Sequence, residues 1–258
     1  MDKSKARKHV IGFTVLALVA GLFAAGASGG RTIVGNLMID FHLDSAPHKL
    51  LRLVDTPIRF WGSARIQTKD GTTPPPLEHL MVEADRFGHL ETRGLPVCTR
   101  RKLLATTAAQ ARGLCPGAIV GTGRGSGVVE FPEQSPIPAS SPITFFNGPE
   151  IGGDPSVIVH AHLDIPAPTT YLVPIRIETI DNGIYGFRVE ADVPPIAGGY
   201  GSITDFRFEF DRKWTLHGKE LHYVNARCQI GHLQAFFETR FVDGTALNSH
   251  FVHPCQVR

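Results

Sequence analysis

The sequence predicts an all-β fold, namely an antiparallel β-sandwich of jelly-roll or immunoglobulin-like type with one short α-helix near residues 99–112. Short segments of alternating apolar and polar residues recur along the chain, which is the pattern of half-buried strands. The 27 glycines and 19 prolines among the 258 residues divide the chain into segments of this kind. About a dozen short strands separated by turns are typical of a sandwich, and a closed barrel is the alternative.

The first 27 residues have the layout of a secretory signal peptide. A basic head precedes an apolar run from residue 10 to residue 25, and Ala25-Gly26-Ala27 then forms a small-x-small cleavage site. The alternative is a retained membrane anchor, because the run is close to the ~20 residues that a spanning helix needs. Glycines in the run and small polar residues after Ala27 favour cleavage. We therefore expect a secreted or cell-envelope protein that touches a membrane only through an uncleaved signal segment.

Removal of this segment changes the charge of the chain. The full sequence has 26 basic and 24 acidic residues, and the segment takes four basic residues and one acidic residue with it. The net charge thereby falls from +2 to −1, so the basic excess is not evidence for a nucleic-acid-binding surface. We expect a single domain over residues 31–258, with a separate N-terminal β-subdomain over residues 31–93 as the alternative.

Alternation places strands along the whole mature chain. The sequence Asp181-Asn182-Gly183 predicts a hairpin, because Asn-Gly tolerates the positive φ angles of a type I′ turn. Turns are also expected at residues 69–71, 85–88 and 243–244, where Asp and Gly interrupt the pattern. The segments with the clearest alternation are residues 37–41, 58–66, 80–84, 173–177, 185–191, 206–210 and 233–241.

One helix is expected, with Thr99 as its N-cap and Gly113 at its C-terminal end. Directly after it, glycines occupy alternate positions from residue 121 to residue 127. On a strand these glycines leave one face without side chains, which predicts close approach of another element, such as the alanine-rich face of the helix. A phosphate-binding glycine loop is the weaker interpretation, because strand-like residues and a proline follow where a helix would have to begin.

The chain contains four cysteines, Cys98, Cys115, Cys228 and Cys255. An even number in an exported chain indicates disulfides. Three pairings are possible, and we favour Cys98 with Cys115 and Cys228 with Cys255, because each of these pairs flanks a compact unit. A zinc site is the rival interpretation, but the chain has no C-x-x-C pair.

His160, His162 and Asp164 form the best metal candidate in the sequence. Residues two apart on a strand face the same side, so both imidazoles could reach one ion and the carboxylate could complete the set. The alternative is that these residues only lie on the wetter face of a strand. His250 and His253 are three apart and would point to opposite faces. Sequence does not show convergence, so we assign no metal and no other cofactor.

Carboxylates in a second segment could perform glycoside hydrolysis. Asp205, Glu209 and Asp211 share one strand face with Arg207, and two carboxyl groups ~5–9 Å apart can cleave a glycosidic bond. The alternative is the solvated face of a strand whose phenylalanines fill the core, and the interleaved arginine favours it. Ser126 lacks the strand-to-helix turn of a nucleophile elbow. We therefore name no catalytic residue.

Three aromatic residues are candidates for carbohydrate binding. Trp61 lies on the polar side of its strand, and Trp214 and Tyr200 lie in loop-like stretches near glycines. Flat rings beside polar side chains can stack on sugars. The alternative for each ring is that it covers an edge of the core.

Five motifs are distributed along the chain from residue 66 to residue 206. They are IQTKDGTTPP at 66–75, GLPVC at 94–98, CPGAIVG at 115–121, FNG at 146–148 and GSITDF at 201–206. In these motifs the chain resembles a group of exported actinobacterial proteins of uncharacterised function. The resemblance covers nearly the whole mature chain and has both cysteine pairs in register. It implies an exported β-rich domain and brings no catalytic residue.

These observations predict an exported, disulfide-stabilised, non-catalytic β-sandwich that acts as a binding or structural module at the cell envelope or outside the cell. The expected partner is an envelope polysaccharide or a surface protein, and no nucleic acid. The alternative is an extracellular hydrolase, on glycans for example, or a metal-dependent enzyme.

Overall fold

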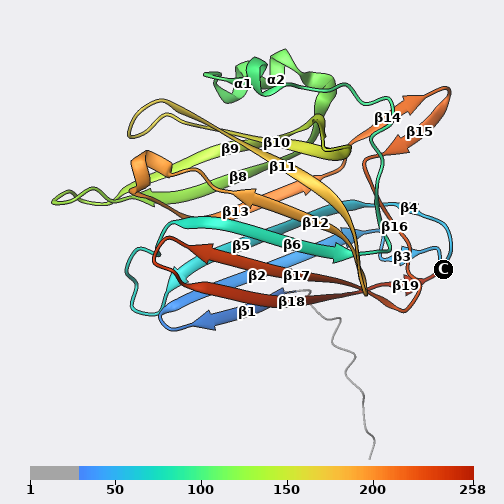
Figure 1. Cartoon of the computed structure of the whole chain (residues 1–258), viewed down its shortest axis with the longest axis horizontal. Helices are drawn as coiled ribbons and strands as arrows, with labels where there is room; N and C mark the ends of the chain where they lie inside the picture. The colour runs from blue at the N-terminus through green and yellow to red at the C-terminus, as the bar shows by residue number, and fades with distance from the viewer. Residues whose placement is uncertain (1–28) are drawn as a thin grey trace, which may run out of the picture.

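The computed structural model describes residues 29–258, and the expected signal segment lies outside the described residues. Antiparallel strands dominate the described chain (Figure 1). Twelve of them form one sheet in the order β1 (Gly29–Val34), β2 (Leu37–Ala46), β5 (Arg59–Thr68), β13 (Gly201–Phe210), β8 (Ile119–Val129), β9 (Ile137–Ile151), β10 (Asp154–Leu163), β11 (Thr169–Asn182), β12 (Tyr185–Asp192), β6 (Leu77–Asp85), β17 (His232–Phe241) and β18 (Ala246–Pro254).

Smaller elements complete the described fold. Three short sheets are formed by β14 (Lys213–Leu216) with β15 (Lys219–His222), by β4 (Thr56–Pro57) with β16 (Val224–Ala226) and β7 (Gly88–Leu90), and by β3 (Lys49–Leu50) with β19 (Gln256–Val257). The helical elements are α1 (Arg100–Leu103), α2 (Ala108–Leu114) and two 3-10 turns, η1 (Pro116–Ala118) and η2 (Ile196–Gly199). No helix within residues 29–258 is long and apolar enough to cross a membrane.

The large sheet is nearly closed, because its terminal strands β1 and β18 lie side by side (Figure 1). The predicted all-β, antiparallel class is therefore confirmed. A sandwich of jelly-roll or immunoglobulin-like type is not evident, because hydrogen bonding continues through all twelve strands in a barrel-like arrangement. The segment 31–93 contributes strands to two separate parts of this sheet: β2 and β5 in one, β6 in the other.

The glycine-rich strand β8 packs against β13. In the antiparallel register Gly121, Gly123 and Gly125 stand opposite Phe210, Phe208 and Phe206. These phenylalanines pack against an apolar cluster on the inner face of the sheet, which includes Phe145. The prediction of close approach is confirmed, but the expected partner, the alanine-rich helix, is wrong. The glycines give room to the backbone and the aromatic rings of the neighbouring strand.

The expected single helix over residues 99–112 is two short helices. Ala105, between them, has a φ of 54°, and the Thr106 hydroxyl donates a hydrogen bond to the Leu103 carbonyl at 2.7 Å. Thr107 then begins α2 with a capping box, in which its hydroxyl accepts from the Gln110 N–H and its own N–H donates to the Gln110 side chain. Thr99 is the N-cap residue of α1, as predicted, but its side chain makes no capping hydrogen bond. The Thr107 cap satisfies free N–H groups at the start of α2.

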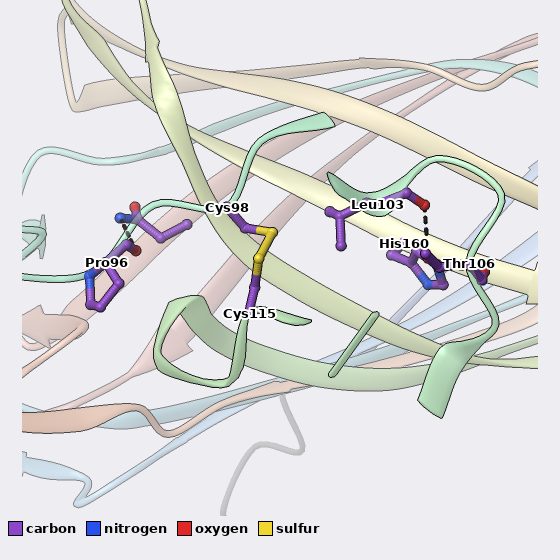
Figure 2. Close-up of a disulfide and its surroundings, with 7 residues drawn as sticks. Pro96, Cys98, Leu103, Thr106, Cys115 and His160 are labelled. Atoms are coloured by element: carbon purple, nitrogen blue, oxygen red, sulfur yellow. Dashed lines mark hydrogen bonds between the residues drawn. A yellow bond between two sulfur atoms is a disulfide. The ribbon is translucent and has the colours of Figure 1, made fainter. Parts of the chain in front are cut away.

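The two helices cover one stretch of the outer face of the sheet, with α2 against β9 and β10 and α1 against β11 (Figure 1). Leu103 and Ala111 bury their side chains against Phe146 and Ile158 of these strands. The Cys98–Cys115 disulfide fastens the two ends of this helical cap (Figure 2). Cys228–Cys255 is the second disulfide, so the favoured sequence-local pairing is confirmed. We use the term helical cap for residues 98–118.

Candidate functional site

Beyond the helical cap, the outer face of the sheet carries polar side chains in three cross-strand rows. Antiparallel register places residues of β5, β13 and β8 opposite one another on the same face. The rows are Trp61, Glu209 and Thr122; Ser63, Arg207 and Arg124; and Arg65, Asp205 and Ser126.

Two shallow depressions follow these rows and share Arg207. The larger, of about 590 Å³, lies over Arg65, Ser126 and Asp205 and reaches the turn after β5. The smaller, of about 410 Å³, contains Trp61, His42, Arg124 and Glu209. Together they form one polar groove across β5, β13 and β8, which we call the outer groove. Of the three aromatic candidates, only Trp61 lines it.

Trp61 and Glu209 are both held by Arg59. The Arg59 guanidinium donates to the two Glu209 carboxylate oxygens at 2.9 and 2.7 Å and lies 5.1 Å from the centre of the Trp61 ring. The hydrogen bonds to Glu209 raise the pKa of Arg59 above its usual value. A bidentate pair of this kind fixes side-chain direction, so the indole is pre-oriented at the end of the groove.

Asp205 is likewise engaged by arginine. Its carboxylate accepts a hydrogen bond from Arg207 at 3.1 Å and lies 4.0 Å from Arg65. Four residues separate Asp205 from Glu209, which is about 13 Å along a strand and exceeds the ~5–9.5 Å between the carboxyls of a glycosidase. Asp211 follows the end of β13 and is exposed.

The other two aromatic candidates, Trp214 and Tyr200, lie outside the outer groove and contact other parts of the protein. The Trp214 indole N–H donates to the Arg93 carbonyl at 3.0 Å, and its ring packs against the inner apolar cluster. Tyr200 is exposed and its ring lies 5.2 Å from that of Phe131. Trp214 thus covers a core edge, as the alternative interpretation holds.

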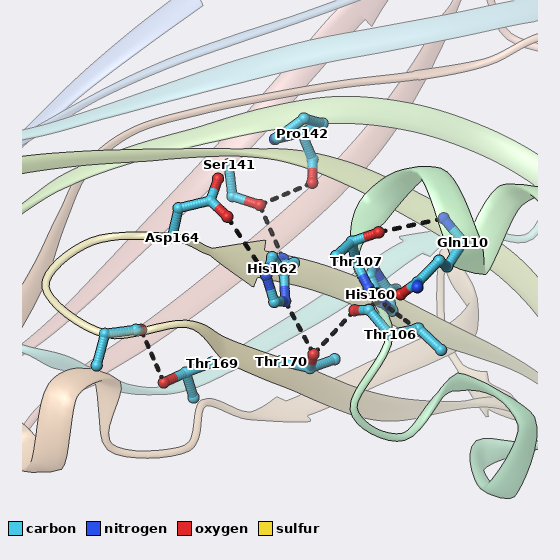
Figure 3. Close-up of polar contacts among 11 residues, drawn as sticks. Thr106, Thr107, Gln110, Ser141, Pro142, His160, His162, Asp164, Thr169 and Thr170 are labelled. Atoms are coloured by element: carbon cyan, nitrogen blue, oxygen red, sulfur yellow. Dashed lines mark hydrogen bonds and ion pairs between the residues drawn. The ribbon is translucent and has the colours of Figure 1, made fainter.

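His160 lies beneath the helical cap and is fully buried. Its Nε2 is 3.1 Å from the Thr106 carbonyl oxygen and 3.0 Å from the Thr106 hydroxyl (Figure 3). The Thr170 hydroxyl donates to the same carbonyl at 2.9 Å. The His160 Nδ1 is buried without a hydrogen-bond partner. These contacts connect the link between α1 and α2 to strands β10 and β11.

His162 belongs to the same polar network. Its Nδ1 is 3.0 Å from the Thr170 hydroxyl, and its Nε2 is 3.5 Å from an Asp164 carboxylate oxygen (Figure 3). Both imidazoles thus face one side of β10, as predicted. Among the described residues, the ligand atoms of this trio do not converge as a metal-binding set. His160 contacts Thr106 of the helical cap directly, and His162 reaches the cap only through Thr170.

Acidification is expected to destabilise the protein through His160. Burial lowers the pKa of His160 below its ordinary value of 6.5, because the charged imidazolium is poorly solvated there. The unfolded chain therefore binds more protons than the folded chain just below that value, and the free energy of unfolding falls as pH decreases from about 6.5. Urea denaturation between about pH 7.5 and about pH 5 should show a smaller pH dependence for His160→Gln. An unchanged dependence would contradict this role.

Sequence reasoning considered Trp61 and Glu209 separately and missed what joins them. Arg59 shares the outer face of β5 with Trp61 two positions away, which is a readable signal. Its pairing with Glu209, 150 residues later, is not readable from the sequence.

A scan against protein-family models, a search of curated proteins and a search of solved structures each found no match for this chain. The fold and the groove define its class: a nearly closed, antiparallel β domain with two disulfides and a polar groove on its outer face.

Proposed function

We propose that the protein is an exported, disulfide-stabilised, non-catalytic β module that binds envelope polysaccharide through the outer groove. Two disulfides are consistent with an oxidising, extracytoplasmic compartment. The signal-like segment and the resemblance to exported actinobacterial proteins point to the same compartment.

The observation that carries the proposal is the place of Trp61 in the outer groove. Trp61 is half-buried and lines the smaller depression, and an indole ring can stack on the C–H face of a sugar ring. Beside it, His42, Thr122, Arg124 and Arg207 offer hydrogen-bonding groups for sugar hydroxyls. An open groove on a sheet suits an extended polymer, since it does not enclose its ligand.

The charges of the groove favour an acidic polysaccharide. Three guanidinium groups line it, those of Arg65, Arg124 and Arg207, against the two carboxylates of Asp205 and Glu209. The carboxylates are already paired with arginine, whereas the Arg124 guanidinium donates to the neutral Ser140 hydroxyl at 2.8 Å. Guanidinium groups bind carboxylate and phosphate in bidentate geometry, so uronate- or phosphate-bearing chains are the preferred class.

The Trp61→Ala variant is expected to bind acidic polysaccharide about two- to twelvefold more weakly, because stacking contributes on the order of 0.5–1.5 kcal/mol. Binding should be measured by affinity electrophoresis in gels containing hyaluronan, with dextran as the neutral comparison. The matched control is Tyr200→Ala, which removes an exposed aromatic ring outside the groove and should leave mobility unchanged.

Two outcomes would overturn the proposal. One is that Trp61→Ala and the unchanged protein are retarded equally by the acidic gel and by an extract of the producer's own envelope polysaccharide. The other is release of reducing sugar from these polymers, which would favour the hydrolase alternative.

A further inference from the structure

Three potential metal ligands converge where β2 meets the end of β18. The Asp44 Oδ1 lies 3.8 Å from the His48 Nδ1 and 3.7 Å from the His253 Nε2. One ligand atom from each of the three residues lies within 4.8 Å of the other two. No other group of three or more such side chains within residues 29–258 meets this criterion.

The backbone around the cluster is held in place by pairing between β3 and the C-terminal strand β19. The Gln256 N–H donates to the His48 carbonyl at 2.9 Å, and the Arg258 N–H donates to the Leu50 carbonyl at 2.8 Å. Cys255, two residues after His253, is fixed to Cys228 by a disulfide. The segments that carry His48 and His253 are thus positioned before any ligand arrives, which lowers the entropic cost of binding.

The three side chains differ in exposure, from the largely buried His253 on the sheet to the largely exposed His48. The exposed fractions are 12% for His253, 27% for Asp44 and 59% for His48. Burial lowers the pKa of His253, which favours the neutral imidazole that a metal requires. An ion at this place would have a sheltered side and a side open to water.

The donor set determines the class of ion. Two imidazole nitrogens and one carboxylate oxygen are suited to zinc and its neighbours, whereas Ca²⁺ and Mg²⁺ prefer sets made of oxygen alone. Three protein ligands leave a tetrahedral position for water, and tetrahedral ligand atoms around Zn²⁺ are about 3.3 Å apart. The two separations from Asp44 need to shorten by about 0.5 Å, and the separation between the histidine nitrogens, which is within 4.8 Å, by up to about 1.5 Å. His48 can provide this movement, because it lies in the exposed turn between β2 and β3.

Ser45 competes with an ion for His253. Its hydroxyl lies 3.2 Å from the same Nε2, so an ion there would replace this hydrogen bond. The Ser45 hydroxyl can rotate, and its backbone N–H remains bonded to the Asp44 carboxylate at 2.8 Å. That second bond orients the carboxylate toward the histidines, in the manner of the outer partners of metal ligands.

We propose that Asp44, His48 and His253 bind one divalent transition-metal ion of the zinc class, with water in the remaining position. The ion ties β2 to β18 at the place where the large sheet closes. This site is separate from the outer groove, and its test does not depend on polysaccharide binding.

Zinc binding should be measured on the purified, metal-stripped protein by calorimetric titration with Zn²⁺ near neutral pH. One ion per chain is expected, and Co²⁺ at the same site should give the visible absorption of a tetrahedral complex. The His48→Ala variant removes a largely exposed ligand and should lower the affinity at least tenfold without unfolding the protein. His89→Ala, an exposed histidine on β7, is the matched control and should bind as the unchanged protein does.

Equal Zn²⁺ affinity for the unchanged protein and His48→Ala would overturn the proposal. Absence of binding at millimolar Zn²⁺, or equally tight binding of Ca²⁺, would do the same. A second variant, Asp44→Asn, keeps the size of the side chain and should also lower the affinity, and its failure to do so would exclude Asp44 as a ligand.

Discussion

Replacement of Gly123 by alanine is expected to lower the free energy of unfolding by about 3 kcal/mol or more. A Cβ at this position would lie 2.2 Å from the Arg207 carbonyl oxygen and 3.3 Å from the Phe208 Cα. These are backbone atoms of β13 that cannot turn aside, so β8 and β13 would have to separate and their ladder would weaken. Thermal unfolding should show a midpoint lower by about 6–12 °C for a domain of this size.

Gly125→Ala is the matched control in the same strand. Its Cβ would meet the Ile143 Cδ1 at 3.1 Å, which is the far end of a flexible side chain. Alanine also restricts the unfolded chain more than glycine does, so the net effect should be within about 1 kcal/mol. Similar stability of the two variants would contradict the close approach of β13 to Gly123.

Local patterns were sufficient to predict most strands but not their partners. The alternating glycines of β8 predict a strand with one bare face, because strand geometry alone imposes that face. The neighbour that fills it is β13, some 80 residues later, and this depends on register across the whole sheet. The helix was predicted at the correct place, but the positive φ of Ala105 and the Thr107 cap divide it. The second threonine cap, at Thr107, is a local detail that an apolar stripe does not reveal.

The candidate site was predictable in its parts only. The polar faces of β5 and β13 are readable from alternation, so Trp61, Asp205 and Glu209 could be named. Whether a polar face is open or covered depends on what crosses it. The helical cap buries His160 on the outer face of β10, whereas the same face of β5 and β13 stays open.

Residues that meet at the closure of the sheet leave no sequence signal. Ser45 and His253 are separated by 208 positions and their side chains are 3.2 Å apart. Spacing rules identify ligands on one strand or helix, and they pointed to His160 with His162, which share a strand. Contacts of this kind arise only because a twelve-stranded sheet brings its two ends together.

Removal of the Cys228–Cys255 disulfide is expected to have the other large effect on stability. The two cysteines have a sequence separation of 27. Replacing both by alanine lets the unfolded chain gain conformational entropy, which lowers the free energy of unfolding by about 3–4 kcal/mol. Both cysteines are buried in one apolar cluster with Leu50 and Ile58, so lost packing adds to the cost. The thermal midpoint should fall by roughly 10 °C.

Loss of Cys228–Cys255 and loss of Cys98–Cys115 are expected to speed up hydrogen exchange in different parts of the protein. Hydrogen exchange should become faster at the Gln256 and Arg258 amides, which pair with the His48 and Leu50 carbonyls, because the chain end is no longer fastened beside β3. The Cys98→Ala/Cys115→Ala variant is the matched control. Its shorter loop, with a separation of 17, corresponds to about 3 kcal/mol, and its faster exchange should be confined to the helical cap. Equal protection of the chain end with and without Cys228–Cys255 would mean that β3 pairing alone holds it, and the sheet closure would then not depend on the disulfide.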